Sequence, residues 1–214
     1  MKVDLEVVSG FIEAGKTAFI NALLDLTSLD EDLILLVVTE QGKSNIKELP
    51  NYKIVLINDD VLLLKEKLIS MILKYKPSRV IIEYNGTYTM DEFFYSIYLN
   101  GLDEYCRLKA IYYILNAEQF LFYFKNMSDL FIPYIENSNL VLINNCHNVS
   151  KEKQREIYKL IASLNYNSHI LFSSNNKEMV VSLKESNLFL KKSYRKLKLH
   201  LRNKLNEYIK KMVN

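Results

Sequence analysis

Residues 10–17 read Gly-Phe-Ile-Glu-Ala-Gly-Lys-Thr and fit the pattern G-x-x-x-x-G-K-[ST] of a phosphate-binding loop. Apolar residues alternate along residues 2–8, which predicts a strand, and recur at helical spacing from Phe19 to Leu26. A strand, a glycine-containing turn and a helix form the context that this pattern requires. The alternative is a tight strand–helix turn whose lysine merely faces solvent. The context favours the phosphate site.

The backbone at a helix N-terminus accounts for the expected chemistry of this loop. Its N–H groups are unpaired and carry a partial positive charge, and glycines let the chain wrap a phosphate without a Cβ clash. Lys16 can reach the β- and γ-phosphates, and the Thr17 hydroxyl can bind Mg²⁺. The loop residues that we expect to contact nucleotide are Gly10, Glu13, Ala14, Gly15, Lys16, Thr17 and Ala18.

Length and composition limit the class of protein. With 214 residues, 49% of them hydrophobic, the chain can bury one good core and carry an appendage. It has no apolar run of 18 residues, and it enters a strand directly, with Asp4 and Glu6 near its start, unlike a signal peptide. Cys106 and Cys146 are the only cysteines, which excludes a disulfide framework. We therefore expect a cytoplasmic location.

Charge is distributed unevenly along the chain. Residues 181–214 hold ten Lys or Arg and two Glu, a formal charge of about +8, so residues 1–180 carry about −5 of the chain's +3. We expect a nucleotide-binding domain over 1–180 and a basic amphipathic helix over 181–214. This helix could pack on the body, or contact a partner or an anionic membrane surface; nucleic acid is the least favoured partner. Its apolar face would carry Leu190, Tyr194, Leu197, Leu201, Leu205, Tyr208 and Met212.

Strand-like and helical segments alternate along the chain, which predicts an α/β fold. Such alternation predicts a mainly parallel sheet with helices on both faces, the architecture of a P-loop NTPase. Continuous apolar runs such as LILLVVT at 33–39 are typical of buried parallel strands. The expected strands are 2–8, 33–39, 53–57, 79–83, 108–115, 140–144 and 169–172, and the expected helices after the first are 61–75, 90–100, 118–124 and 150–164.

Polar residues follow several of these expected strands. Glu40 follows residues 33–39, Glu83 ends 79–83 and precedes Gly86, and Asn144 ends 140–144. The carboxyl ends of parallel strands meet at one edge of a sheet, where ligands bind. We therefore interpret these residues and the glycine-rich loop as parts of one site.

The motifs resemble those of the P-loop GTPases of the CobW, HypB and UreG group, which load or handle metals for enzyme maturation. The resemblance covers residues 1–175 and is greatest to the CobW branch. It is carried by VSGFIEAGKTAFINALL at 8–24, RVIIEYNG at 79–86, AIYYILNAEQF at 110–120, SNLVLINNCHN at 138–148 and IASLNYNSHILFSS at 161–174. A Glu-x-Gly loop of the family corresponds to Glu40-Gln41-Gly42.

The resemblance implies a Mg²⁺-dependent GTP-binding protein or GTPase, a nucleotide switch in metal-centre or cofactor assembly. Mg²⁺ and GTP, or another nucleoside triphosphate, would be its cofactors, and a client protein its partner; a homodimer is left open. Lys16 would hold the phosphates, and Glu83 would meet Mg²⁺ directly or through water. Glu40 would orient the attacking water or sense the γ-phosphate. Gly86 would let the loop after Glu83, which corresponds to a switch segment of the family, reach the γ-phosphate. The simpler alternative for both glutamates is a solvated acid. The alternative function is a non-catalytic or relaxed-specificity nucleotide-binding module.

Two departures from the family pattern bear on specificity. The guanine-reading Asn-Lys-x-Asp is replaced by Asn144-Asn145-Cys146-His147, and a neutral imidazole offers at most one acceptor where aspartate accepts two hydrogen bonds. The Cys-x-Cys-Cys metal motif of the CobW branch is replaced by Ile-Asn-Asp-Asp at 57–60, which has no thiol. Guanine preference and thiol-based metal binding are therefore both in question, whereas the phosphate motif is intact.

Overall fold

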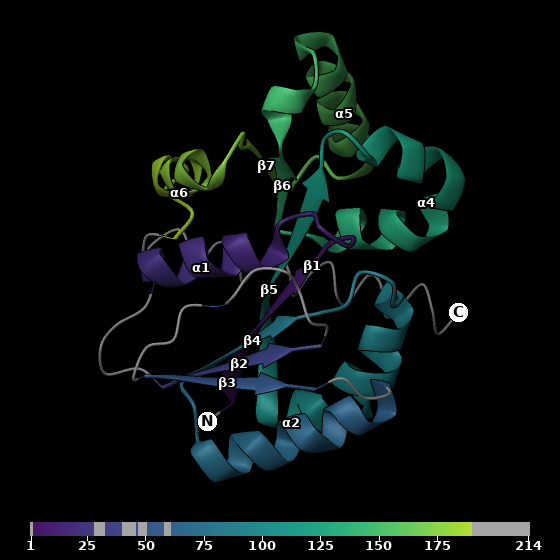
Figure 1. Ribbon diagram of the computed structural model, residues 1–214. Coiled ribbons are helices and arrows are strands. Elements are labelled where there is room, and N and C mark those ends of the chain that lie inside the picture. Colours follow the sequence, from purple (N-terminus) through teal and green to yellow (C-terminus); the bar gives the residue numbers. More distant parts are fainter. Residues whose placement is uncertain (1, 28–32, 40–45, 47–50, 58–60, 190–214) are drawn as a thin grey trace.

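The fold is built on a seven-stranded sheet. The computed structural model describes residues 2–27, 33–39, 46, 51–57 and 61–189. The strand order is β3-β2-β4-β1-β5-β6-β7, and every neighbouring pair is parallel (Figure 1). The predicted α/β fold with a parallel sheet is confirmed. The strands are β1 (Val3–Ser9), β2 (Ile34–Val38), β3 (Tyr52–Leu56), β4 (Arg79–Glu83), β5 (Cys106–Asn116), β6 (Leu140–Asn144) and β7 (His169–Phe172).

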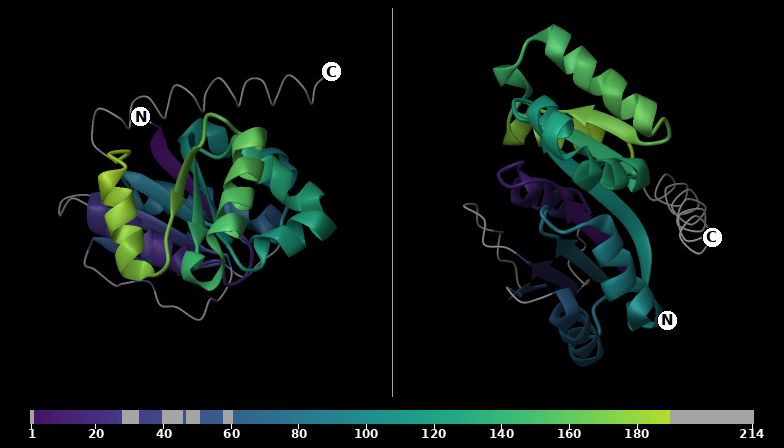
Figure 2. Two further views of the ribbon diagram at one scale, coloured as in Figure 1. Left: turned by 90° about the horizontal axis from the view of Figure 1, so that it is seen from above. Right: turned by 90° about the vertical axis from the view of Figure 1, so that its right-hand side faces the viewer.

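Helices cover both faces of the sheet, as predicted. α1 and α6 pack on one face, and α2, η1, α4 and α5 on the other (Figure 2). Alternate side chains of each strand point to opposite faces of the sheet. In β1, Leu5 and Val7 belong to the core under α2, η1, α4 and α5, and Val8 belongs to the core under α1 and α6. The helices are α1 (Lys16–Thr27), α2 (Val61–Tyr75), η1 (Glu92–Leu102), α3 (Asp103–Tyr105), α4 (Phe120–Asn137), η2 (Cys146–Asn148), α5 (Lys151–Leu164) and α6 (Asn176–Glu185).

Three of the longer helical segments differ from the sequence-based expectation. The helix expected over 90–100 is a π-helix, η1, whose end is broken at Asn100 and Gly101. The helix expected over 118–124 extends through α4, which continues past a kink at Met127 and contains Pro133. The helical periodicity of apolar residues is interrupted at such a kink, so the sequence pattern indicates only the part of α4 that precedes Met127. α6 begins at Asn176, whereas the expected C-terminal helix begins at 181; Asn175 caps α6 by accepting bonds from the backbone N–H groups of Lys177 and Glu178.

α6 spans the expected boundary between residues 180 and 181. Met179 and Leu183 are buried against α1, so residues 181–185 continue the covering of the sheet. The division of the chain into a nucleotide-binding domain and a basic tail stays a prediction, because residues 190–214 lie outside the described part. Among the helices that the structure describes, none combines the length and the apolar character needed to cross a membrane.

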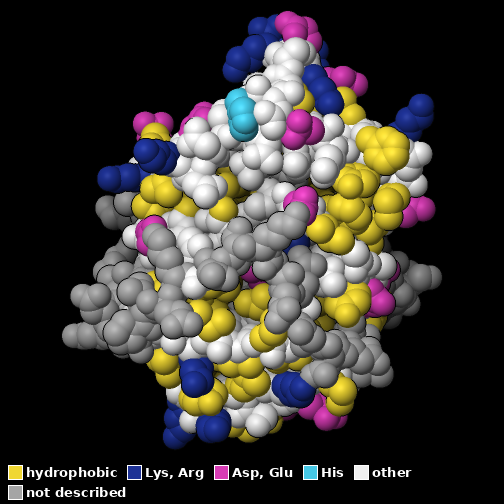
Figure 3. All heavy atoms as spheres, viewed as in Figure 1, with side chains coloured by type: hydrophobic (Ala, Val, Ile, Leu, Met, Phe, Trp, Pro, Cys, Tyr) yellow, Lys and Arg dark blue, Asp and Glu magenta, His cyan; other side chains and the backbone are white. Residues whose placement is uncertain are grey.

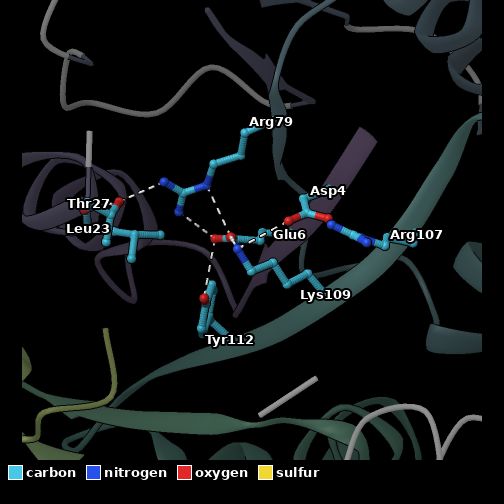
Figure 4. Close-up of polar contacts among 8 residues, drawn as sticks. All are labelled: Asp4, Glu6, Leu23, Thr27, Arg79, Arg107, Lys109 and Tyr112. Carbon is cyan, nitrogen blue, oxygen red and sulfur yellow. Dashed lines mark hydrogen bonds and ion pairs between the residues drawn. The ribbon is translucent and has the colours of Figure 1, made fainter. Parts of the chain in front are cut away.

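A buried ion network ties the sheet to α1 at the edge opposite the glycine-rich loop (Figure 4). The fully buried Glu6 accepts two bonds from the guanidinium of Arg79, at 3.1 Å from Nε and 2.6 Å from Nη2. Tyr112 donates its hydroxyl to Glu6 at 3.2 Å, and Arg79 Nη1 donates to Thr27 Oγ1, in the last turn of α1, at 2.6 Å. A buried carboxylate requires such pairing, so these contacts fix β1, β4, β5 and the end of α1 to one another.

The network continues through Asp4. Arg107 Nε donates to the Asp4 carboxylate, and Lys109 Nζ lies 3.3 Å from its other oxygen and 3.9 Å from Glu6 Oε1. Burial raises the pKa of Asp4, but the hydrogen bond from Arg107 and the charge of Lys109 together bring that pKa below its usual value. Asp4 therefore stabilises the fold above its unfolded pKa, and this contribution is lost as the pH falls through the lower folded value.

Candidate nucleotide-binding site

The glycine-rich loop connects the carboxyl end of β1 to the first residue of α1. Three of its residues have positive φ: Gly10 at 151°, Glu13 at 61° and Gly15 at 104°. A Cβ on Gly10 would lie 2.1 Å from the carbonyl oxygen of Ile114, and one on Gly15 would lie 2.4 Å from Nδ2 of Asn144. Gly10 is therefore required by its packing against backbone as well as by φ, whereas at Gly15 the requirement is its φ and the added clash is with a side chain. The loop leads into the N-terminus of α1, where backbone amides can hold an anion.

Lys16 lies inside the curve of the loop. Its side chain is buried, and Nζ donates to the carbonyl oxygens of Gly10 at 2.9 Å and Phe11 at 3.2 Å. The ammonium is thus held over the loop by the loop's own backbone. This position is the one from which a P-loop lysine can turn to bound phosphates.

Thr17 and Glu83, the two predicted Mg²⁺ ligands, meet although they are 66 positions apart. Thr17 Oγ1 donates to Glu83 at 2.9 Å from Oε1 and 3.3 Å from Oε2, and both residues are buried. A hydroxyl and a carboxylate are hard oxygen ligands of the kind that Mg²⁺ prefers. The donor set therefore fits Mg²⁺.

Asn144 joins the end of β6 to the loop. Its Nδ2 donates to the carbonyl oxygen of Ala14 at 3.0 Å, and the residue is 5% exposed. Its Oδ1 has no hydrogen-bond partner among the described residues. A buried acceptor of this kind is costly when left unsatisfied, so the position is suited to a donor from a bound molecule.

The loop after Asn144 carries the residues that stand in place of the expected guanine-reading motif. Asn145 is left-handed, with φ 58°, and the backbone N–H of Cys146 donates to the carbonyl oxygen of Ser173. Cys146 is buried, and burial raises the pKa of its thiol, so this sulfur suits the core better than a metal site. His147 is exposed. Among the described residues, no three His, Cys, Asp or Glu side chains gather as a metal site would require.

Two contacts at the phosphate end were not foreseen from the sequence. The backbone of Gly86 lies directly against the loop: a Cβ there would be 2.0 Å from the Gly10 carbonyl oxygen. Thr39, at the end of β2, donates its hydroxyl to the backbone oxygen of Glu83 at 2.9 Å and accepts from the N–H of Asn85 at 2.8 Å. The only sign of Thr39 in the sequence is a single hydroxyl residue after six aliphatic residues.

The remaining predicted residues are placed as follows. Ala14 is buried, Ala18 is half-buried, and both belong to the loop and the first turn of α1. Glu40 lies outside the described residues, and so do residues 58–60 of the segment that replaces the Cys-x-Cys-Cys motif.

An apolar surface adjoins the loop on the side of α4. The ring centroids of Phe11 and Tyr123 lie 4.4 Å apart, and a small pocket opens between the loop, the end of β5 and α4. Hydrophobic side chains gather over α4 at the upper right of Figure 3. Among the residues of α4, Phe122 is 68% exposed and Met127 is 42% exposed.

The fold and the site together define a P-loop nucleotide-binding domain. The loop follows the first strand of a parallel sheet, and the buried Thr17–Glu83 pair and Asn144 lie around it. A model of the CobW/HypB/UreG nucleotide-binding domain matches residues 4–172, most of the chain. The chain belongs to this family of P-loop GTPases.

Solved structures share the fold at low sequence identity. The chain is similar to Zn(II)-bound YjiA GTPase from E. coli, with TM-score 0.60 and 14% identity over 79% of this chain and 57% of that one. It is similar to HypB from Helicobacter pylori in complex with nickel, with TM-score 0.51 and 12% identity over 92% and 89%. The chain thus spans just over half the length of the YjiA chain. No curated protein sequence matches it.

Proposed function

We propose that this chain is a Mg²⁺-dependent GTP-binding protein that hydrolyses nucleotide slowly and acts as a switch in metal-centre or cofactor assembly. The observation that carries the proposal is the buried contact between Thr17 and Glu83, directly beside Lys16. This contact places a hydroxyl and a carboxylate where the metal of a bound nucleotide would need oxygen ligands.

The residues of the site have distinct roles in this proposal. The amides from Glu13 to Thr17 and the Lys16 ammonium bind and orient the phosphates. Thr17 and Glu83 would hold Mg²⁺, which when bound neutralises charge on the phosphates. Asn144 holds the loop against the end of β6, and its unsatisfied Oδ1 would accept a donor from the bound nucleotide. Glu40 would orient the attacking water or sense the γ-phosphate.

The wider role rests on the family and on its neighbours. YjiA and HypB were solved with zinc and nickel respectively, which supports a part for this chain in handling metals. A client protein would then be its partner, in the cytoplasm, and two copies could associate. The basic segment 181–214 would contact the body, a partner or an anionic membrane surface.

A second candidate is a nucleotide-binding module of relaxed base specificity, without catalysis. The exposed His147 favours it, because this residue stands where the family places the aspartate that reads guanine. Losing that charged, two-bond contact removes the main source of guanine selection.

Phosphate release from GTP and from ATP, each with Mg²⁺, tests both candidates. We expect Mg²⁺-dependent release from GTP slower than about 1 s⁻¹, below the range of ordinary enzymes. Rates for ATP within about tenfold of those for GTP are expected from the change at His147. Release at background level from both nucleotides would contradict the enzymatic proposal. A GTP preference of about a hundredfold or more would contradict relaxed specificity.

A further inference from the structure

Glu13 occupies a position of the phosphate loop that favours glycine. The N–H of Ala14 donates to the carbonyl oxygen of Phe11 at 3.1 Å, which closes a turn whose third residue is Glu13. Its φ of 61° is left-handed, as is usual for glycine at the third position of a type II turn. The other two positive-φ positions of the loop, Gly10 and Gly15, do hold glycine. The loop thus presents a carboxylate where a residue without a side chain would fit with less strain.

The location of this carboxylate gives it an electrostatic effect on the ligand. Glu13 is exposed, so its charge is outside the core, whereas the neighbouring Lys16 is buried and bonded to loop carbonyls. The backbone of Glu13 is part of the phosphate loop itself. Its side chain therefore lies within roughly one Debye length, about 10 Å at 0.1 M salt, of any bound phosphate. At that separation a carboxylate repels an anion.

We propose that Glu13 makes the site selective for the magnesium complex of a nucleoside triphosphate over the free nucleotide. The inference rests on the proposed function. A bound divalent cation removes roughly two of the about four negative charges of the triphosphate and so relieves about half of the repulsion from Glu13. The Thr17–Glu83 pair offers oxygen ligands for that cation within the same site.

Equilibrium titration with a fluorescent GTP analogue, in excess Mg²⁺ and in EDTA, tests the proposal. Glu13→Gln is expected to tighten binding of the metal-free nucleotide about five- to tenfold, and binding of the magnesium complex only about two- to threefold. The difference is expected to shrink as salt is raised. Glu13→Gly, which also removes the left-handed strain, is expected to show the same change in the ratio of the two affinities.

Glu104→Gln is the matched control, because it makes the same charge change at an exposed residue of α3. Glu104 lies just before the amino end of β5, whereas the phosphate loop follows the carboxyl end of β1. It is expected to leave both affinities unchanged. Equal effects of Glu13→Gln with and without Mg²⁺, or no effect in either, would overturn the inference while leaving the proposed function intact. If the wild-type chain bound neither form of the nucleotide, the proposed function itself would fail.

Discussion

Lys16→Ala is expected to weaken binding of a magnesium–GTP complex by about a hundredfold, because it removes the only side-chain cation of the phosphate loop. The structure holds this ammonium 2.9 Å from the Gly10 oxygen and 3.2 Å from the Phe11 oxygen. Binding requires it to exchange these neutral carbonyls for charged phosphate oxygens, and hydrogen bonds between charged groups are the stronger kind. Isothermal titration calorimetry of the two proteins measures the difference.

A remote lysine provides the control for net charge. Lys53 is exposed and lies in β3, an edge strand of the sheet. Lys53→Ala is expected to bind nucleotide as the wild type does, and thermal unfolding of both variants checks that they are folded. Unchanged affinity in a folded Lys16→Ala protein would show that residues 10–17 are not a phosphate-binding loop.

Gly86→Ala is expected to disrupt the phosphate loop, because the backbone of Gly86 packs directly against the backbone of that loop. The added methyl carbon would lie 2.0 Å from the Gly10 oxygen and 2.9 Å from the Phe11 Cα, so one segment must move. The loop cannot retreat easily, because Gly10 already packs against the backbone of Ile114. We expect the free energy of unfolding to fall by about 3 kcal/mol, the upper part of the range for overpacking, with loss of nucleotide affinity.

Gly101 offers a matched glycine-to-alanine control. Its φ is 108°, but no described atom lies within 4 Å of a Cβ built there. Gly101→Ala should therefore cost only the left-handed strain, roughly 1–2 kcal/mol, and leave nucleotide binding unchanged. Urea unfolding and nucleotide titration of both variants separate the two effects. If Gly86→Ala bound nucleotide as tightly as Gly101→Ala, the close contact between Gly86 and the loop would have no functional role.

The sequence was sufficient to predict the sheet, since continuous apolar runs such as 33–39 have few alternatives to a buried strand. It was insufficient for segments whose conformation depends on partners distant in the chain. The π-helical form of η1, the continuation of α4 past Met127 and the position of α6 against α1 all depend on tertiary packing. Local periodicity carries no signal for these features.

The phosphate end of the site could likewise be predicted from motif and strand order. Parallel strands bring Thr17 and Glu83 to one edge, and the structure joins them. The contact of Gly86 with Gly10 and the role of Thr39 are not local properties, so no pattern indicates them. The left-handed φ of Glu13 was also hidden, because glutamate gives no sequence signal for it. The roles of Glu40 and of the basic tail stay predictions, since Glu40 and residues 190–214 lie outside the described residues.

The most direct test of the nucleotide site is calorimetric titration of the wild-type chain with GTP in the presence of Mg²⁺. The arrangement of Lys16, Thr17, Glu83 and Asn144 predicts saturable binding of one nucleotide per chain with a dissociation constant in the micromolar range or below, roughly −8 kcal/mol or better. Absence of binding by any triphosphate at concentrations up to about 1 mM would contradict the assignment of residues 10–17 as a phosphate-binding loop.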